Sequence, residues 1–290
     1  MNEGALHDFI HIGDVTLHVV FTGPADGPPV VLLHGFPEFW YGWRHQIPAL
    51  ANAGYRVIVP DQRGYNLSDK PKRVRDYRHD RLVRDIIQLI DVLNVPTVSL
   101  IGHDWGGAVA WGVAARHADR IERLIVLNCP HPAVMYRHLR RKPRQMLRSW
   151  YIGWFQVPWL PEITMRLWNW RLLTRVLLKM SSRGSFTEDD LSVYREAWSQ
   201  PGAITAMVDW YRALVRARGA SPIPDQIISP TLLIWGERDN ALGKELTPDS
   251  IALCDNGKLE YLPQAGHFVQ HDAPGEVNRL ILDFLAGTSL

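Results

Sequence analysis

An aspartate stands between glycines where a short apolar run gives way to a helical segment. The residues Gly102-His103-Asp104-Trp105-Gly106-Gly107 follow the run Val98-Ser99-Leu100-Ile101. In this G-x-Nuc-x-G pattern, small residues let a strand and a helix approach closely around a strained turn that presents the central side chain. A carboxylate with a pKa of about 3.9 is ionised at neutral pH, so it attacks a saturated carbon without a base. Asp104 is therefore predicted to be a nucleophile that forms an ester; a plain turn with a capping Asp is the alternative.

Hydrolysis of such an ester requires a general base that activates water. Gly266-His267-Phe268 lies in a loop after a short apolar segment and just before the final helical segment. In the chain order nucleophile, acid, histidine, this is where the histidine stands, so His267 is predicted to be the base. The neighbouring His271 is interpreted as a surface residue.

The histidine needs an acid that orients it and stabilises the imidazolium. Two carboxylates follow the apolar run Thr231–Trp235, in Gly236-Glu237-Arg238-Asp239. Asp239 is preferred because it lies deeper in the loop, and Glu237 remains the alternative.

A second loop supplies a candidate oxyanion hole. His34-Gly35-Phe36-Pro37-Glu38 follows the apolar run Val30–Leu33. The backbone N–H groups of Phe36 and Trp105 are predicted to stabilise the tetrahedral intermediate on the Asp104 carboxyl carbon. A His-Gly-x-Pro run also occurs in ordinary turns, so this evidence depends on the rest of the pattern.

The elements that position these residues alternate between strands and helices. Amphipathic or small apolar helical segments separate apolar runs of the kind that form parallel strands buried on both faces. The pattern predicts a mostly parallel, doubly wound α/β sheet. Residues 131–219 interrupt it with an Arg- and Trp-rich helical stretch, so we expect a core of 1–130 and 220–290 with a helical cap, 131–219, inserted. The runs are 30–33, 56–60, 98–101, 121–127 and 231–235, and the helical segments are 82–93, 108–116 and 273–285.

Composition excludes several classes of protein. The chain of 290 residues holds 32 basic and 30 acidic residues, which is too balanced to suggest nucleic acid as a partner. It has two cysteines, no basic start leading into an apolar run, and no apolar stretch of membrane-spanning length. We expect a cytoplasmic monomer or homodimer that needs neither metal nor organic cofactor.

Taken together, these residues resemble the soluble epoxide hydrolase branch of the α/β-hydrolase superfamily. The matching segments span nearly the whole chain in the expected order: 34–38, 61–65 running to 68–71, 102–107 and 266–268. The resemblance implies an α/β-hydrolase fold and hydrolysis of a lipophilic epoxide to a vicinal diol.

The resemblance also implies two cap tyrosines that hydrogen-bond the epoxide oxygen and protonate the alkoxide as the ring opens. The segments that match are Tyr151-Ile152-Gly153-Trp154-Phe155-Gln156 and Asp209-Trp210-Tyr211-Arg212. Tyr151 and Tyr211 are thus the expected acids. Most cap tryptophans are interpreted as packing between cap and sheet, and a few as walls of an apolar pocket. The expected pocket residues are His34, Pro37, Trp105, Trp154 and Phe268.

Two other functions use the same pattern. A haloalkane dehalogenase also needs an Asp nucleophile, an acid and a His base. In such an enzyme Trp105 would donate its indole N–H to the leaving halide. Phe36, however, stands where many of those enzymes carry an Asn, and the two tyrosines have no use there. A small-molecule binding protein that has lost turnover is the non-enzyme alternative. A basic stretch at 137–148 indicates either a solvated cap face or a membrane-contacting one.

Overall fold

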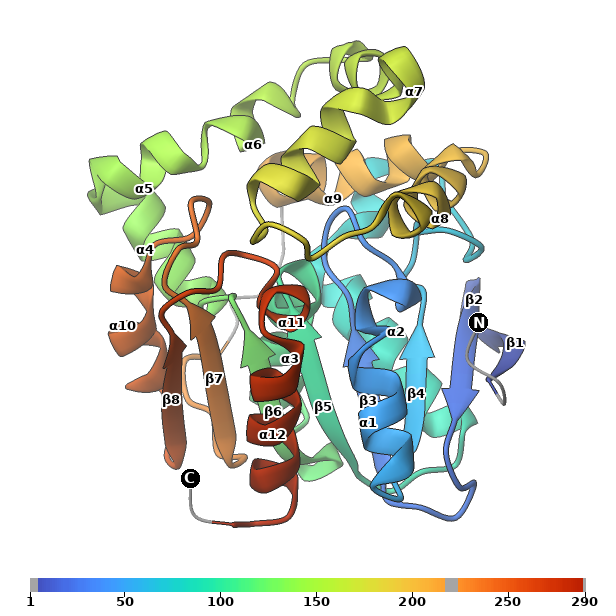
Figure 1. Ribbon diagram of the computed structural model, residues 1–290, viewed down its shortest axis with the longest axis vertical. Coiled ribbons are helices and arrows are strands. Elements are labelled where there is room, and N and C mark those ends of the chain that lie inside the picture. The colour runs from blue at the N-terminus through green and yellow to red at the C-terminus, as the bar shows by residue number, and fades with distance from the viewer. Residues whose placement is uncertain (1–4, 217–223, 289–290) are drawn as a thin grey trace.

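The computed structural model describes residues 5–216 and 224–288. Within these residues eight strands form one sheet with the order β1-β2-β4-β3-β5-β6-β7-β8 (Figure 1). The strands are β1 (Leu6–Ile12), β2 (Val15–Thr22), β3 (Pro29–Leu33), β4 (Arg56–Pro60), β5 (Val98–His103), β6 (Ile121–Leu127), β7 (Thr231–Gly236) and β8 (Gly257–Leu262).

The sheet is parallel from β4 across to β8, whereas β2 runs antiparallel to both of its neighbours, β1 and β4. The central strand β5 is buried along its whole length because helices cover both of its faces. This explains why the parallel strands are continuous apolar runs rather than alternating ones. The carboxyl ends of β3, β5, β6 and β7 therefore meet at one edge of the sheet, which is where open α/β folds bind ligands. The predicted α/β fold is confirmed.

Helices pack on both faces of the sheet. Helices α1 (Gln46–Asn52) and α12 (Pro274–Leu285) share one apolar cluster with one face of the strands. Helices α2 (His79–Val92) and α3 (Trp105–Arg116) share another cluster with the opposite face. Short elements complete this part of the chain: η1 (Trp40–Trp43), η2 (Val74–Tyr77), η3 (Ala118–Arg120), η4 (Lys244–Leu246), α10 (Thr247–Ile251) and α11 (Val269–Asp272).

Between β6 and β7 the described chain, 131–216, is helical and contains no strand. These helices, here called the cap helices, lie over the carboxyl edge of the sheet in Figure 1. The expected boundary at 219–220 falls outside the described residues. The cap helices are α4 (Pro132–Arg141), α5 (Pro143–Arg148), α6 (Trp150–Trp154), α7 (Leu160–Lys179), α8 (Glu188–Ser199) and α9 (Ala203–Arg216).

The expectation that most cap tryptophans pack between cap and sheet is wrong. Trp170, Trp198 and Trp210 are buried, Trp154 is half-buried, and the others are exposed. The reason lies partly in α7, whose backbone leaves the helical conformation from Leu167 to Trp170, so its apolar stripe does not stay on one face. The exposed tryptophans are Trp150, Trp159 and Trp168.

Candidate active site

Asp104 occupies a sharp turn between β5 and α3. Its backbone has φ 49° and ψ −121°, a conformation that L-residues rarely adopt and that marks stored strain. The turn is possible because its flanks are glycines. A Cβ on Gly102 would lie 2.4 Å from the carbonyl oxygen of Gly106, and one on Gly106 would lie 2.1 Å from that of Leu33. The turn presents the Asp104 side chain at the carboxyl edge of the sheet.

Three of the predicted residues meet at this edge. Nε2 of His267 lies 3.5 Å from Oδ2 of Asp104, and Nδ1 of His267 lies 2.7 Å from Oδ2 of Asp239. The side chains of His267 and Asp239 are almost completely buried, while that of Asp104 keeps 16% of its surface exposed. The histidine thus stands between two carboxylates, one shielded from solvent and one accessible.

This charge arrangement shifts all three pKa values. Burial by itself would raise the pKa of the Asp104 carboxyl, but the hydrogen bond and charge of His267 outweigh burial and lower it. The pKa of Asp239 is lowered by the same balance. Burial by itself would lower the pKa of His267, yet its two carboxylate neighbours raise it to about 10. At neutral pH the site therefore holds an imidazolium between two carboxylates.

The loop after β7 holds the acid firmly. Oδ1 of Asp239 accepts hydrogen bonds from the backbone N–H groups of Ala241 (2.7 Å) and Leu242 (2.9 Å). Oδ2 accepts one from Asn128 Nδ2 (2.8 Å) besides its contact with His267. Glu237, the sequence alternative, forms a surface ion pair with Lys244.

Asn128 was missed by the sequence analysis. It follows β6 directly, and its Oδ1 also accepts from the backbone N–H of Gly236 at 2.8 Å. Its φ of 40° lies in the left-handed region that favours Asn. A polar residue directly after a buried parallel strand was the available signal.

The loop after β3 brings a backbone donor to the nucleophile. The N–H of Phe36 donates to Asp104 Oδ1 at 2.9 Å, so one carboxylate oxygen is held while Oδ2 faces His267. Gly35 permits this approach, because a Cβ there would lie 2.4 Å from the Asp104 Cβ. The second expected donor, the N–H of Trp105, belongs to the first residue of α3, where a helix has no internal acceptor.

The two tyrosines lie on different cap helices and meet above the nucleophile loop. Tyr151 comes from α6 and Tyr211 from α9, with ring centroids 5.9 Å apart. The Tyr211 ring packs edge-on against Trp105 (5.1 Å) and Phe36 (5.3 Å), the two residues of the expected oxyanion hole. Burial first, and then the nearby Asp104 charge, raise the pKa of both phenols. Both hydroxyls are therefore protonated donors at neutral pH.

The expected pocket residues occupy different positions around this centre. His34 is fully buried, with Nδ1 next to the Gly35 carbonyl and Nε2 accepting from the Gln62 N–H, so it supports the loop. Pro37 is buried behind a cis Phe36–Pro37 bond. Phe268 is buried with its ring 5.0 Å from that of His267, and half-buried Trp154 packs on Phe155.

A buried carboxylate lies behind the catalytic loops. Glu38 Oε1 accepts from the Tyr194 hydroxyl of α8 (2.6 Å) and from His271 Nε2 (2.7 Å), and Oε2 accepts from Gln270 (2.9 Å). Although burial opposes ionisation, the adjacent His271 and His103 hold the pKa of Glu38 well below its usual value. His103 also contacts the carbonyl oxygen of His267 through Nε2 at 2.9 Å.

The interpretation of His271 as a surface residue is therefore wrong. Its side chain is completely buried because α11 turns it inward, against Glu38 and the ring of Phe186. The position of His271 after the predicted turn gave no sign that its side chain is buried. A short helix of one turn follows His267, and its sequence is too short for a readable periodicity.

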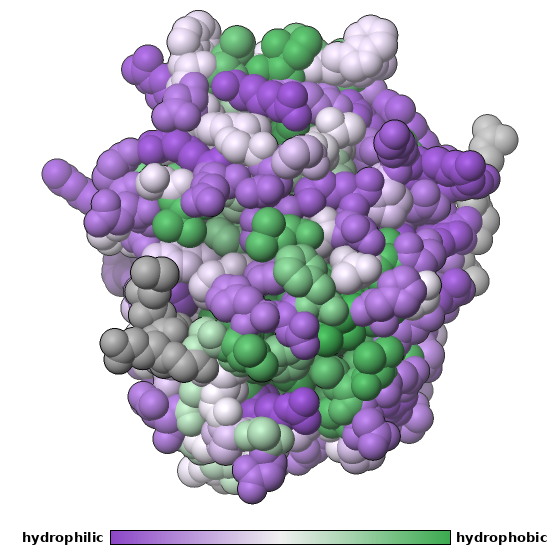
Figure 2. Space-filling view, turned by 90° about the vertical axis from the view of Figure 1, so that its right-hand side faces the viewer, coloured by the Kyte–Doolittle hydropathy of each residue, from purple (hydrophilic) through white to green (hydrophobic). Residues whose placement is uncertain are grey.

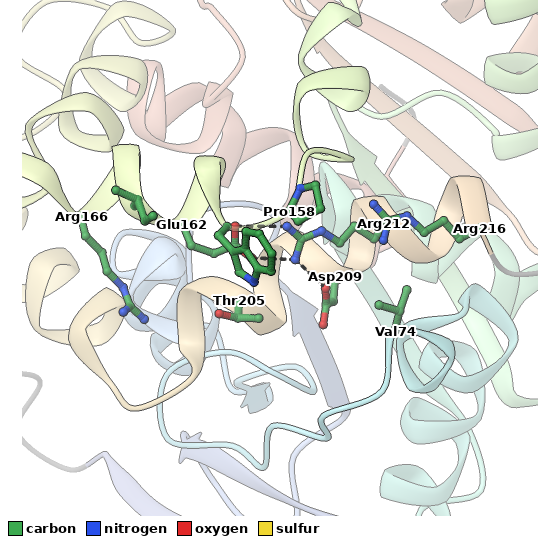
Figure 3. Close-up of a pocket in the computed structure, with 10 residues that line it drawn as sticks. Val74, Pro158, Glu162, Arg166, Thr205, Asp209, Arg212 and Arg216 are labelled. Atoms are coloured by element: carbon green, nitrogen blue, oxygen red, sulfur yellow. Dashed lines mark hydrogen bonds and ion pairs between the residues drawn. The ribbon is translucent and has the colours of Figure 1, made fainter.

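A cavity of about 590 Å³ lies elsewhere, between η2 and the cap helices α7 and α9 (Figure 3). Arg212 crosses it and pairs with Glu162 (2.6 Å) and Asp209 (3.1 Å). None of the residues predicted to be catalytic lines this cavity. The pair that Arg212 of α9 makes with Glu162 of α7 joins these two helices.

Comparisons with known proteins identify the family of this chain. Residues 28–274 match a family model described as alpha/beta hydrolase fold. The chain is 46% identical to "AB hydrolase superfamily protein YfhM" of Bacillus subtilis, covering 98% of this chain and 99% of that one. It is 37% identical to "Epoxide hydrolase 4" of Homo sapiens, covering 96% and 78%.

Solved structures give the same result. A Bacillus megaterium epoxide hydrolase bound to an inhibitor superposes with a TM-score of 0.88 and 32% identity, covering 96% of this chain and 100% of that one. Epoxide Hydrolase A of Mycobacterium thermoresistibile superposes with a TM-score of 0.82 and 29% identity, covering 99% of each chain. The chain therefore belongs to the α/β-hydrolase superfamily, in the branch that contains the epoxide hydrolases.

Proposed function

We propose that this protein hydrolyses lipophilic epoxides to vicinal diols through an ester on Asp104. The observation that carries the proposal is an aspartate at the nucleophile turn, backed by His267 and Asp239, with two phenols packed over it. A carboxylate attacks a strained ring carbon directly, and the phenols supply protons to the leaving oxygen. Residues 131–219 act as an inserted cap that brings Tyr151 and Tyr211 to a core of 1–130 and 220–290.

In the first step Oδ2 of Asp104 attacks one ring carbon. Oδ1 is the less available oxygen because it accepts the Phe36 N–H at 2.9 Å. The carbon–oxygen bond of the ring breaks, and the alkoxide takes a proton from Tyr151 or Tyr211. The result is a hydroxyalkyl ester with an uncharged Asp104 and one phenolate.

Loss of the Asp104 charge prepares the second step. The imidazolium of His267 owes its high pKa to two carboxylates, and ester formation neutralises one of them. The pKa of His267 falls, and its proton is available to restore the phenol through solvent. The neutral imidazole, oriented by Asp239, is then a base toward water.

Water attacks the Asp104 carboxyl carbon while His267 takes its proton. The oxyanion forms on Oδ1, where the N–H groups of Phe36 and Trp105 stabilise it. Collapse breaks the bond between this carbon and Oδ2, and the imidazolium protonates the departing alkoxide. The diol thus carries away one original Asp104 oxygen. The Asp104 carboxyl group contains one oxygen from water, and transfer of its remaining proton to His267 restores the carboxylate and the imidazolium.

The substrate environment is aromatic. Phe36, Trp105 and Phe155 surround the Tyr211 ring, and such walls favour apolar substrates and exclude bulk water. A haloalkane dehalogenase would use the same nucleophile, but it would have no role for the paired phenols. The choice between them is experimental.

The test is diol formation from styrene, stilbene and aliphatic epoxides, with 1-haloalkanes measured alongside. Wild-type protein is expected to form diol and release no halide, and Asp104→Asn to form no diol. Asp91→Asn is the matched control because Asp91 is an exposed α2 residue whose carboxylate, among the described residues, pairs with Arg120. Halide release without diol would replace the proposal by dehalogenation. A single turnover in ¹⁸O-water should label Asp104, and label found only in the diol would contradict the ester mechanism.

A further inference from the structure

The outer surface of the cap helices exposes large apolar side chains. Leu147, Trp150, Trp159 and Trp168 are 75%, 67%, 76% and 78% exposed. The top of the molecule, where α7 lies in Figure 1, shows hydrophobic groups surrounded by hydrophilic ones (Figure 2). We call these exposed side chains together the cap face; Trp159 and Ile163 also line the rim of the cavity in Figure 3. The cap face comprises Met146, Leu147, Trp150, Trp159, Leu160, Ile163, Leu167, Trp168 and Leu172.

Local backbone geometry helps to present these side chains outward. The two most exposed tryptophans, Trp159 and Trp168, have φ values of 61° and 50°. Non-glycine residues in this left-handed region carry a conformational cost, so the fold maintains both against local preference. Trp159 immediately precedes α7, and Trp168 lies at its interruption. Leu160, Ile163 and Leu167 have the spacing of one helix face between them.

The same segment carries a strong positive charge. Residues 132–183 include eleven Lys and Arg side chains and one acidic residue, Glu162, against a chain that is otherwise slightly acidic. Glu162 is buried and paired with Arg212, so it does not offset the surface charge. Among the described residues, Arg137 and Arg148 pair with Asp225 and Glu245. The exposed basic residues are Arg140, Arg141, Lys142, Arg144, Arg166, Arg171, Arg175, Lys179 and Arg183.

We propose that the cap face binds the surface of an anionic lipid bilayer. Indole rings are favoured at the membrane–water interface, and Lys and Arg there attract anionic headgroups while their stems cover apolar surface. A second copy of this chain would bring the same positive charge against the face. Nucleic acid would match the charge but not the exposed Leu and Ile side chains. No helix in the described segments can cross a bilayer, so contact would be peripheral.

Attachment through this face has a consequence for substrate supply. Trp150 is adjacent in sequence to Tyr151 on the five-residue helix α6, so the cap face approaches the phenol side of the active site. Lipophilic epoxides partition into bilayers, and a bound enzyme would meet them there. This consequence rests on the proposed function, whereas the membrane contact itself does not.

The experiment is sedimentation of the whole protein with vesicles of phosphatidylcholine containing phosphatidylglycerol, and with vesicles of phosphatidylcholine alone. Binding is expected only to the anionic vesicles and should weaken as salt screens the attraction. Replacing Arg140, Arg141 and Lys142 by Gln should reduce affinity roughly a hundredfold, because each basic side chain contributes about fivefold near an anionic surface. Replacing Trp150, Trp159 and Trp168 by Ser should reduce it by at least ~10-fold.

A matched control separates the cap face from general hydrophobicity. Leu6 and Phe9 of β1 are also exposed (63% and 57%), and the double Ser variant is expected to bind vesicles like wild type. Diol formation from soluble epoxides should persist in the tryptophan variant, which shows that it folds. Absence of binding at low salt, or binding unaffected by the tryptophan changes, would overturn the proposal. So would a wild-type dimer that the tryptophan variant fails to form.

Discussion

The two sides of the active site are held by different forces. On the sheet side, charged groups are held by short hydrogen bonds: Asp239 by two backbone N–H groups and Asn128, and His267 by Asp239 at 2.7 Å. On the cap side, Tyr151 and Tyr211 are held mainly by ring packing at centroid distances near 5–6 Å.

This difference matters for how each side tolerates change. A buried charge that loses its partner carries a large desolvation cost, so the sheet side is intolerant of single substitutions. Aromatic packing is distributed over several rings, and a phenol that loses its hydroxyl keeps its contacts. We therefore expect sheet-side changes to stop the cycle at a defined step, and cap-side changes to slow one step without stopping it.

The largest effect is expected from His267→Gln. The variant keeps the Asp104 nucleophile and the tyrosines, so ring opening should proceed and ester hydrolysis should stop. Mass spectrometry of the Asp104 peptide should then show stoichiometric addition of one epoxide, with steady-state turnover reduced by at least ~10⁴-fold. His11→Gln, at an exposed strand position, is the control. Unmodified Asp104 after prolonged incubation would contradict the division of labour.

A smaller effect is expected from removing each phenol hydroxyl. Tyr151→Phe and Tyr211→Phe should each slow ring opening by about 10²–10⁴-fold, the usual range for general acid catalysis. Ester hydrolysis, measured from a pre-formed adduct, should change little because it depends on His267. Tyr136→Phe, an exposed cap tyrosine, should leave both rates unchanged. Equal loss in both steps would mean that the phenols support the site rather than protonate the alkoxide.

The pH dependence of stability provides a third test of the sheet side. The folded-state pKa of His267 is about 10, against 6.5 for an unperturbed histidine. Its contribution to the free energy of unfolding is therefore complete below pH 6.5 and is lost as pH rises toward 10. Asp104→Asn removes one of the two carboxylates, so the pKa of His267 should fall and this loss should be smaller.

Urea unfolding at pH 6, 8 and 10 measures this difference, and an NMR titration of the His267 ring assigns it. Wild type should lose more stability than Asp104→Asn between pH 6 and 10. If the free energy of unfolding falls equally with pH in the two proteins, Asp104 does not raise the pKa of His267. The other titratable side chains are present in both proteins, so their contributions to the pH dependence of stability cancel in the comparison.

The sequence supported the sheet side of the site better than the cap side. Parallel strands buried on both faces appear as continuous apolar runs, so β3 to β7 and the loops that follow them were readable. Asp104 and Asp239 come from two such loops, after β5 and β7, and their proximity follows from the topology. His267 follows β8, which is not a continuous apolar run, so its Gly-His-Phe context and its place before the final helix indicated it. The apolar runs did not indicate the order of the strands in the sheet.

Cap packing was less predictable because it depends on how helices turn relative to one another. The interruption of α7 between Leu167 and Trp170 changes which residues face solvent, and no glycine or proline marks it. The inward orientation of His271 depends on a partner, Glu38, that is 233 residues away in sequence. Periodicity reports a face of one element, but not the neighbour that covers it.

The smallest catalytic effect is expected at the contact between cap helix α8 and the buried Glu38, which joins the cap side to the sheet side. The Tyr194 hydroxyl of α8 donates to the fully buried Glu38, which lies behind the loop that presents Phe36. Tyr194→Phe should destabilise the protein by about 1.5–3 kcal/mol, the usual contribution of a hydrogen bond to a charged group. It should slow turnover by less than ~10-fold, because His271 and Gln270 still hold Glu38 and no reacting atom is touched.

Tyr41→Phe is the matched control, because the Tyr41 hydroxyl also donates to a carboxylate of α8, that of Asp190. Tyr41 is half-buried, so the expected loss of stability is below ~1 kcal/mol. Equal losses of stability in the two variants would show that burial of Glu38 adds nothing to the attachment of the cap helices.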